Sequence, residues 1–375
     1  MEQREDAVLF LKEVLNIASV NGRDDEGKVA EYLQKCFQNH GIASFVDRID
    51  GRHANVLAFL EGEDTTTEIW NGHLDTVDYG NLGIWETNPR EVVEKNGKIY
   101  ARGASDMKSG LAAMVYVLCH LPKRPKRSIQ FIGTCDEEKG GLGARKILEK
   151  EQMKSAEILL ISEPSAMDLA LAQKGCLWLK VKVKGKTGHG AYPEQGVNAI
   201  HFLYEMAKEL RVYIEGFGHY LLGDSTLQIN QIQGGIVPNM TADNCEAVLD
   251  IRMVPSLTAD MVLARAEQIL QTLKQEKPAL DMRFEVMNQR RAIEIAQEER
   301  EVQKLRQMIE KRGYQPKPIG INYFTDASIL AQNELTQKVL ICGPGEPELA
   351  HQPNEYVEIR KYLDYIEVLK EYACE

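Results

Sequence analysis

A histidine and an aspartate two residues apart, His73 and Asp75, follow an apolar stretch that begins at Thr67. Side chains at positions i and i+2 of an extended chain lie on the same side, so these two groups can meet. The arrangement suits an imidazole that binds a metal ion and a carboxylate that accepts its other ring N–H. Taken alone, the pair is more typical of a surface turn after a strand.

Further acidic and imidazole side chains follow other stretches that predict buried strands. They are Glu137, Glu138, Glu163 and His351. In a largely parallel sheet, ligands bind outside the carboxyl ends of the strands, which meet at one edge. We therefore expect these side chains to share one site with His73 and Asp75.

Asp106 precedes an Ala-rich apolar stretch, residues 107–121, that predicts a helix. Aspartate is a favoured first residue of a helix, so capping alone would explain it. If Asp106 instead belongs to a metal site, the candidate ligands are two imidazoles and three carboxylates: His73, Asp106, Glu138, Glu163 and His351. Two divalent cations that share one carboxylate need about this many ligands. Nitrogen and oxygen donors without thiolate suit Zn²⁺ and also allow Co²⁺ or Mn²⁺.

The adjacent pair Glu137–Glu138 indicates a division of labour, because neighbouring side chains diverge. One carboxylate can hold a metal ion while the other faces the substrate as a general base. A solvated helix start, favoured by the helix dipole, is the alternative. The glycines at 140, 141 and 143 do not indicate a dinucleotide site, because the third glycine of that fingerprint is absent and carboxylates would repel a pyrophosphate.

The elements that must position these residues alternate between strands and helices, which predicts an α/β fold with a mixed, mostly parallel sheet flanked by helices. Strands are expected at 43–49, 55–60, 67–70, 98–101, 128–133, 156–162 and 338–342, and helices at 6–18, 26–39, 107–121, 140–149 and 299–312. Between residues 176 and 291 the order becomes β-α-β-β-α-β, typical of a ferredoxin-like module. We predict a first domain of 1–174 and 292–375 and an inserted domain of 175–291.

The overall composition narrows the class of protein. A formal net charge of -11 argues against nucleic acid or an anionic membrane as a partner. The longest apolar run, 111–121, is too short to cross a bilayer. The amino-terminal residues lack the pattern of a signal peptide. Seven unpatterned cysteines suit the reducing cytoplasm. Cys135 alone lies beside candidate site residues.

The ordered motifs together resemble the di-zinc hydrolase family of acetylornithine deacetylase, succinyl-diaminopimelate desuccinylase, aminoacylase and glutamate carboxypeptidase. The resemblance covers the whole chain, and its motifs are His73-Leu74-Asp75, the run from Arg102 to Lys108, Asp136-Glu137-Glu138, Glu163-Pro164, the run from Gly188 to Pro193, and Ala350-His351. It implies a zinc-peptidase-like catalytic domain, an inserted dimerisation or lid domain, and two Zn²⁺ per subunit.

The resemblance also implies a role for each site residue. His73 and Glu163 would hold one zinc ion, Glu138 and His351 the other, with Asp106 bridging both. Asp75 would orient His73, and the peptide bond after Asp106 would be cis. In the inserted domain, His189 would reach the substrate oxyanion across a homodimer, while Arg252 and Asn239 would contact the substrate. A plain turn at Asn239 and an exposed strand position at Arg252 remain alternatives.

The activity that follows is removal of an acyl group from a small, anionic N-acyl amino acid. Water held between the zinc ions would attack the amide, with Glu137 as the general base. The expected types are N-succinyl-diaminopimelate desuccinylase and N-acetylornithine deacetylase, and the alternative is a dipeptidase or glutamate carboxypeptidase. A binding protein that keeps the fold without catalysis is disfavoured, because no ligand and no base is missing from the sequence.

Overall fold

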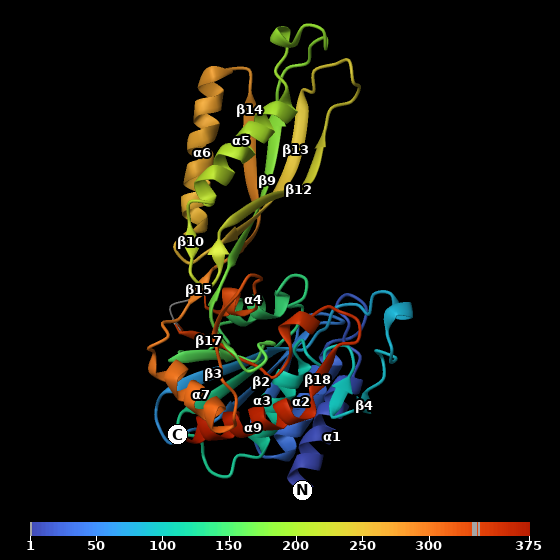
Figure 1. The fold of residues 1–375 in the computed structure, drawn as a ribbon, viewed down its shortest axis with the longest axis vertical. Coiled ribbons are helices and arrows are strands. Elements are labelled where there is room, and N and C mark those ends of the chain that lie inside the picture. The colour runs from blue at the N-terminus through green and yellow to red at the C-terminus, as the bar shows by residue number, and fades with distance from the viewer. Residues whose placement is uncertain (1, 332–335, 337) are drawn as a thin grey trace. The chain divides into compact units, whose positions relative to one another are not determined.

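The computed structural model describes residues 2–331, 336 and 338–375, which divide into two compact units (Figure 1). The first comprises Met1–Leu171, Ile295–Ile319 and Thr325–Glu375, and the second comprises Ala172–Glu294 and Gly320–Phe324. Among the described residues, no helix has both the length and the apolar character needed to cross a membrane.

A nine-stranded mixed sheet, most of which belongs to the first unit, has the order β1-β2-β6-β3-β7-β17-β8-β15, with β16 also paired to β8. The strands are β1 (Ala43–Arg48), β2 (Ala54–Leu60), β3 (Thr67–His73), β6 (Ser128–Thr134), β7 (Ile158–Ile161), β8 (Leu169–Gln173), β15 (Ile293–Glu294), β16 (Pro318–Ile321) and β17 (Val339–Ile341). The central strands β6, β3, β7 and β17 are parallel. Their residues are almost all buried, as expected for strands covered on both faces.

Helices cover this sheet: α1 (Glu2–Asn16), α2 (Gly27–Asn39), α3 (Lys108–Cys119), α4 (Leu142–Glu149), α7 (Arg300–Lys311), α8 (Ala327–Leu330) and α9 (Ile359–Cys374). Helix α3 packs on β3 and against α1 and α9, in the layer below the sheet in Figure 1. Its residues from Lys108 to Leu118 are all buried. The expected α/β class is therefore confirmed.

A small antiparallel sheet in the order β18-β5-β4 also belongs to the first unit. It consists of β4 (Val93–Lys95), β5 (Lys98–Tyr100) and β18 (Tyr356–Glu358). It pairs the chain just before Asp106 with the chain just after His351. Short 3₁₀ turns lie at Leu82–Ile84 and Pro347–Leu349.

The second unit is an antiparallel sheet in the order β12-β13-β9-β14. Its strands are β9 (Gly175–Lys184), β12 (Thr226–Gly234), β13 (Asn244–Met253) and β14 (Asp281–Arg290), with helices α5 (Ala199–Ile214) and α6 (Ala259–Glu276). A hairpin of β10 (Gly218–His219) and β11 (Gly223–Asp224) and a 3₁₀ turn at Pro193–Gln195 complete it. This order is that of a ferredoxin-like module.

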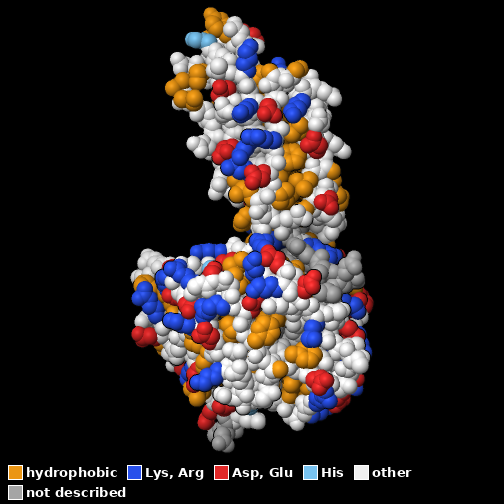
Figure 2. All heavy atoms as spheres, turned by 180° about the vertical axis from the view of Figure 1, so that it is seen from behind, with side chains coloured by type: hydrophobic (Ala, Val, Ile, Leu, Met, Phe, Trp, Pro, Cys, Tyr) orange, Lys and Arg blue, Asp and Glu red, His pale blue; other side chains and the backbone are white. Residues whose placement is uncertain are grey.

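Strand β9 shows why one face of this module is covered. Leu177, Leu179 and Val181 are fully buried in the core that also contains α5 and α6 residues, whereas Lys180 and Lys182 alternate with them on the other face. Charged side chains are spread over the face of the second unit that Figure 2 shows.

Candidate metal centre

Parallel strands bring the candidate site residues to one edge of the large sheet. His73 is the last residue of β3, and it lies opposite Thr134, the last residue of β6. Glu137 and Glu138 follow β6 after a short turn, and Glu163 follows the end of β7. Because β3 lies between β6 and β7, all these side chains emerge from neighbouring strand ends.

Asp106 lies at the centre of this group, and its two oxygens face different imidazoles. The Nε2 atom of His73 is 3.1 Å from Oδ1 of Asp106, and the Nε2 atom of His351 is 3.4 Å from Oδ2. Helix α3 begins at Lys108, and the residue at its N-cap position is Met107, which makes no side-chain capping hydrogen bond. Asp106 therefore does not act as the helix cap, and its carboxylate is directed to the two histidines.

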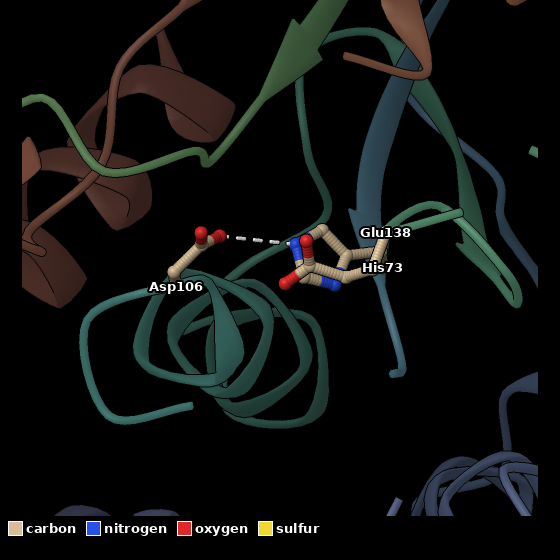
Figure 3. Close-up of side chains that lie close together, drawn as sticks. All are labelled: His73, Asp106 and Glu138. Carbon is tan, nitrogen blue, oxygen red and sulfur yellow. Dashed lines mark hydrogen bonds and ion pairs between the residues drawn. The ribbon is translucent and has the colours of Figure 1, made fainter. Parts of the chain in front are cut away.

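Two glutamates complete the set around Asp106. Oε2 of Glu138 is 2.9 Å from Nε2 of His351, and Oε1 of Glu163 is 4.0 Å from Nε2 of His73. Figure 3 shows His73, Asp106 and Glu138, whose potential ligand atoms all lie within 4.8 Å of one another. The peptide bond between Asp106 and Met107 is cis, as the family resemblance implies.

Asp75 contacts this group in a way that differs from the simplest expectation. Nδ1 of His73 is 3.0 Å from the main-chain oxygen of Asp75 and 3.7 Å from its carboxylate. The carboxylate instead accepts the main-chain N–H groups of Glu137 and Glu138, each at 3.2 Å. It also accepts a hydrogen bond from Nδ2 of Asn21 at 2.8 Å. Asp75 thus fixes the His73 ring by its main chain and the Glu137–Glu138 loop by its side chain.

The carboxylates in this site are electrostatically crowded. Burial, together with the charge of Glu163, raises the pKa of Glu137 well above its ordinary value. Burial and the charges of Asp106 and Glu138 likewise raise the pKa of Glu163. Hydrogen bonds to Asp106 and Glu138 raise the pKa of His351 to about 10. Such a cluster needs positive charge nearby to keep its carboxylates ionised.

The donor set fits divalent cations on chemical grounds. Oε1 of Glu138 is buried and has no hydrogen-bond partner among the described residues, as expected of an atom reserved for a ligand. Imidazole and carboxylate donors match Zn²⁺, Co²⁺ and Mn²⁺. Cys135 is no competitor, because the thiol is fully buried and its pKa is raised by that burial.

Three predicted substrate contacts belong to the second unit. Nδ1 of His189 accepts the main-chain N–H of Ala191 at 3.1 Å, which leaves Nε2 as the outward donor. The main-chain oxygen of Asn239 accepts the N–H of Gly190 at 2.8 Å, so these two segments are paired. Arg252 is held by Asp250, with Nε and Nη2 at 2.9 and 3.1 Å from its two oxygens.

Two residues near the metal centre were missed by the sequence analysis. Asp326 is buried, and its charge raises the pKa of both Glu137 and Glu163. Asn21 donates from one amide to Asp75 and to Asp136, at 2.8 and 2.9 Å. Asp326 directly precedes a short helix that follows strand β16, a position similar to that of Asp106, and this was the available signal.

Comparisons with known proteins place this site in context. Over 396 residues the chain is 28% identical to a probable succinyl-diaminopimelate desuccinylase from Staphylococcus aureus strain N315, covering 97% of this chain and 96% of the relative. It is 28% identical over 358 residues to the acetylornithine deacetylase of Buchnera aphidicola, covering 93% and 91% of the two chains.

Solved structures share the fold. The aminopeptidase PepT of Bacillus cereus superposes with a TM-score of 0.79 at 22% identity, covering 99% of this chain and 98% of that one. A dinuclear metal-binding peptidase of the M20 family from Bacillus subtilis gives a TM-score of 0.74 at 13% identity, covering 99% and 98%. Residues 69–375 match the model of Peptidase family M20/M25/M40, so this chain belongs to that family and is a hydrolase.

Proposed function

We propose that the chain is a metal-dependent amide hydrolase that removes the acyl group from an N-acyl amino acid. The observation that carries this proposal is the division of the two Asp106 oxygens between His73 and His351, at 3.1 and 3.4 Å. The two relatives named as a desuccinylase and a deacetylase support the substrate class. N-succinyl-diaminopimelate and N-acetylornithine are the leading candidates.

The residues present would hold two cations, which we propose to be zinc, with cobalt or manganese as alternatives. His73 and Glu163 would hold one ion and Glu138 and His351 the other, with Asp106 shared between them. When bound, such ions polarise a carbonyl group and lower the pKa of a bound water towards about 7.

Glu137 is the group best placed to move a proton. Its main-chain N–H donates to the Asp75 carboxylate at 3.2 Å, and its carboxyl group is not among the proposed metal ligands. Glu137 lies beside the proposed ligands Glu138 and Glu163, and we propose that its carboxylate takes a proton from the attacking water. The same carboxyl group then passes that proton to the departing amine.

The second unit would supply the substrate contacts. We propose that His189 donates from Nε2 to the developing oxyanion from the partner subunit of a homodimer, an effect worth about 3 kcal/mol for one donor. Asn239 lies on the segment paired with that of His189. Arg252 would bind a substrate carboxylate with the donors that Asp250 leaves available.

All seven cysteines are free, which supports a cytoplasmic location.

A substrate panel tests the proposal. The metal-free chain is loaded with two equivalents of Zn²⁺ and assayed on N-succinyl-diaminopimelate, N-acetylornithine, a dipeptide and a peptide with carboxy-terminal glutamate. We expect kcat/KM for one N-acyl substrate to exceed that for either peptide by about 100-fold or more, corresponding to about 3 kcal/mol of discrimination. Hydrolysis of the peptides alone would overturn it.

Peptide hydrolysis is the second candidate function. It is favoured by structural neighbours named as an aminopeptidase, a carboxypeptidase and a dipeptidase. At identities of 22%, 18% and 17%, these neighbours establish a shared fold. The same substrate panel decides between the two activities.

A further inference from the structure

Glu355 is a fully buried carboxylate that ends the segment following His351. Its Oε1 atom accepts the main-chain N–H groups of Ser105 and Asp106 at 2.8 and 2.9 Å. Its Oε2 atom accepts the main-chain N–H of Gly103 at 3.0 Å and Nη1 of Arg102 at 2.8 Å. All four donors come from one loop, residues 102–106.

This loop has no regular secondary structure to satisfy its main chain. It lies between β5, which ends at Tyr100, and α3, which begins at Lys108. Buried main-chain N–H groups must find partners, and an unpaired one costs free energy comparable to a lost hydrogen bond. Glu355 provides acceptors for three of them, including the N–H of Asp106 itself. The carboxylate therefore holds the main chain from which the shared ligand projects.

Further hydrogen bonds connect the loop 102–106 to the chain on both sides of His351. Nη1 of Arg102 also donates to the main-chain oxygen of Gln352 at 3.1 Å. On the other side, the Ser105 hydroxyl donates to the main-chain oxygen of Glu346 at 3.0 Å and accepts its N–H at 2.6 Å. His351 itself has a half-exposed side chain and a left-handed main chain with φ of 62°. Its position therefore depends on these flanking contacts.

We propose that Glu355 is a positioning residue that fixes the Asp106 carboxylate relative to the His351 imidazole, and with it the spacing of the two cations. The inference rests on the proposed function, because it assumes that both ions bind. A carboxylate that merely neutralised Arg102 would need no bonds to the main chain of the ligand loop. Here three of the four bonds go to that main chain.

The experiment measures metal affinity in the full chain. Co²⁺ is titrated into metal-free wild type, Glu355→Gln and Glu355→Asp, and binding is followed by calorimetry and by the visible absorption of the bound ion. Glu68→Gln is the matched control, because Glu68 is also a buried glutamate paired with an arginine, Arg127, and it lies at the opposite end of β3 from His73. Far-UV circular dichroism confirms that each variant is folded.

We expect Glu355→Gln to weaken the second Co²⁺ equivalent by about 10- to 100-fold and to change its absorption, as is typical when a residue that orients ligands is altered. Glu355→Asp keeps the charge beside Arg102 but shortens the reach, so it should show the same direction of change. Glu68→Gln should bind both ions as wild type does. A folded Gln or Asp variant with wild-type affinity for both ions would overturn the inference.

A measurement on the wild type decides the case in which both variants fail to fold. The metal-free chain is subjected to amide hydrogen exchange, and the segment 101–107 is compared with the central strands. Preformed bonds to Glu355 predict protection of this segment before any ion is added; exchange at the rate of an unfolded peptide would refute them. Wild type that binds fewer than two ions would contradict the proposed function, and this inference with it.

Discussion

The His73 ring is anchored by the main-chain oxygen of Asp75, 3.0 Å from Nδ1, while the carboxylate of Asp75 lies 3.7 Å away. The Asp75 side chain, which the sequence places beside His73, thus has a different role from its main chain. It accepts the main-chain N–H groups of Glu137 and Glu138 and so shapes the loop that carries the proposed base and one proposed ligand. This separation of roles can be tested directly.

Asp75→Asn should leave the His73 ring in place, because the main-chain contact survives. The new amide N–H would face a main-chain N–H of Glu137 or Glu138, and an unsatisfied buried donor costs about 1–3 kcal/mol. We expect kcat to fall by about 10-fold or more while Zn²⁺ content stays near wild type, measured by steady-state kinetics and elemental analysis. Asp50→Asn is the control, because Asp50 also accepts two main-chain N–H groups but lies on a surface turn. Loss of Zn²⁺ from Asp75→Asn, with kcat per metal-loaded chain unchanged, would contradict this division of roles.

Glu137→Gln tests the proton-transfer role. The amide cannot accept a proton from water, and general base catalysis contributes about 10²–10⁴-fold to rate. We therefore expect kcat to fall within that range while the metal content is unchanged. Glu149→Gln, at an exposed residue of α4 that pairs with Lys146, should retain full activity. A Glu137→Gln variant with wild-type kcat would show that another group accepts the proton.

A pH dependence of stability follows from Glu68, far from the metal centre. Burial raises the pKa of Glu68 to about 7 from 4.5, although Arg127 lies nearby. The folded chain therefore holds this proton more tightly than the unfolded chain. The resulting stabilisation is full below pH 4.5 and is lost as the pH rises through about 7.

Glu68→Gln should remove this dependence while keeping an acceptor for the Trp70 indole N–H, which lies 3.1 Å from Oε1 of Glu68. Between pH 5 and pH 8 we expect wild type to lose about 2–3 kcal/mol more stability than the variant. Urea unfolding at several pH values measures this difference. Glu157→Gln, at the exposed partner of the same arginine, is the control. Parallel pH profiles for wild type and Glu68→Gln would rule the explanation out.

Much of the fold and the site's location followed from the sequence, because buried parallel strands appear as continuous apolar runs and polar residues at their ends share an edge. The helix starting near Asp106 was also expected, but capping and metal binding use the same residue type. Only the positions of His73 and His351 separate these interpretations. Gly143, in the glycine-rich stretch after Glu138, has a packing cause: a Cβ there would lie 2.4 Å from Oδ1 of Asn55.

Other features could not be predicted, because they depend on contacts between residues far apart in the chain. Asn21 meets Asp75 across 54 residues, and Glu355 meets Asp106 across 249. The contact between His73 and the main-chain oxygen of Asp75 does not depend on any side-chain type, so the sequence cannot indicate it. Strands β4, β16 and β18, of three or four residues each, are too short to show a period.

Asp106 is the residue on which the proposed pair of cations depends, because each of its oxygens faces a different imidazole. Equilibrium dialysis of the metal-free chain against Zn²⁺, for wild type and Asp106→Asn side by side, tests this most directly. The shared carboxylate predicts two ions per wild-type chain and loss of affinity for both in the variant. One ion per wild-type chain, or two retained by Asp106→Asn, would contradict it.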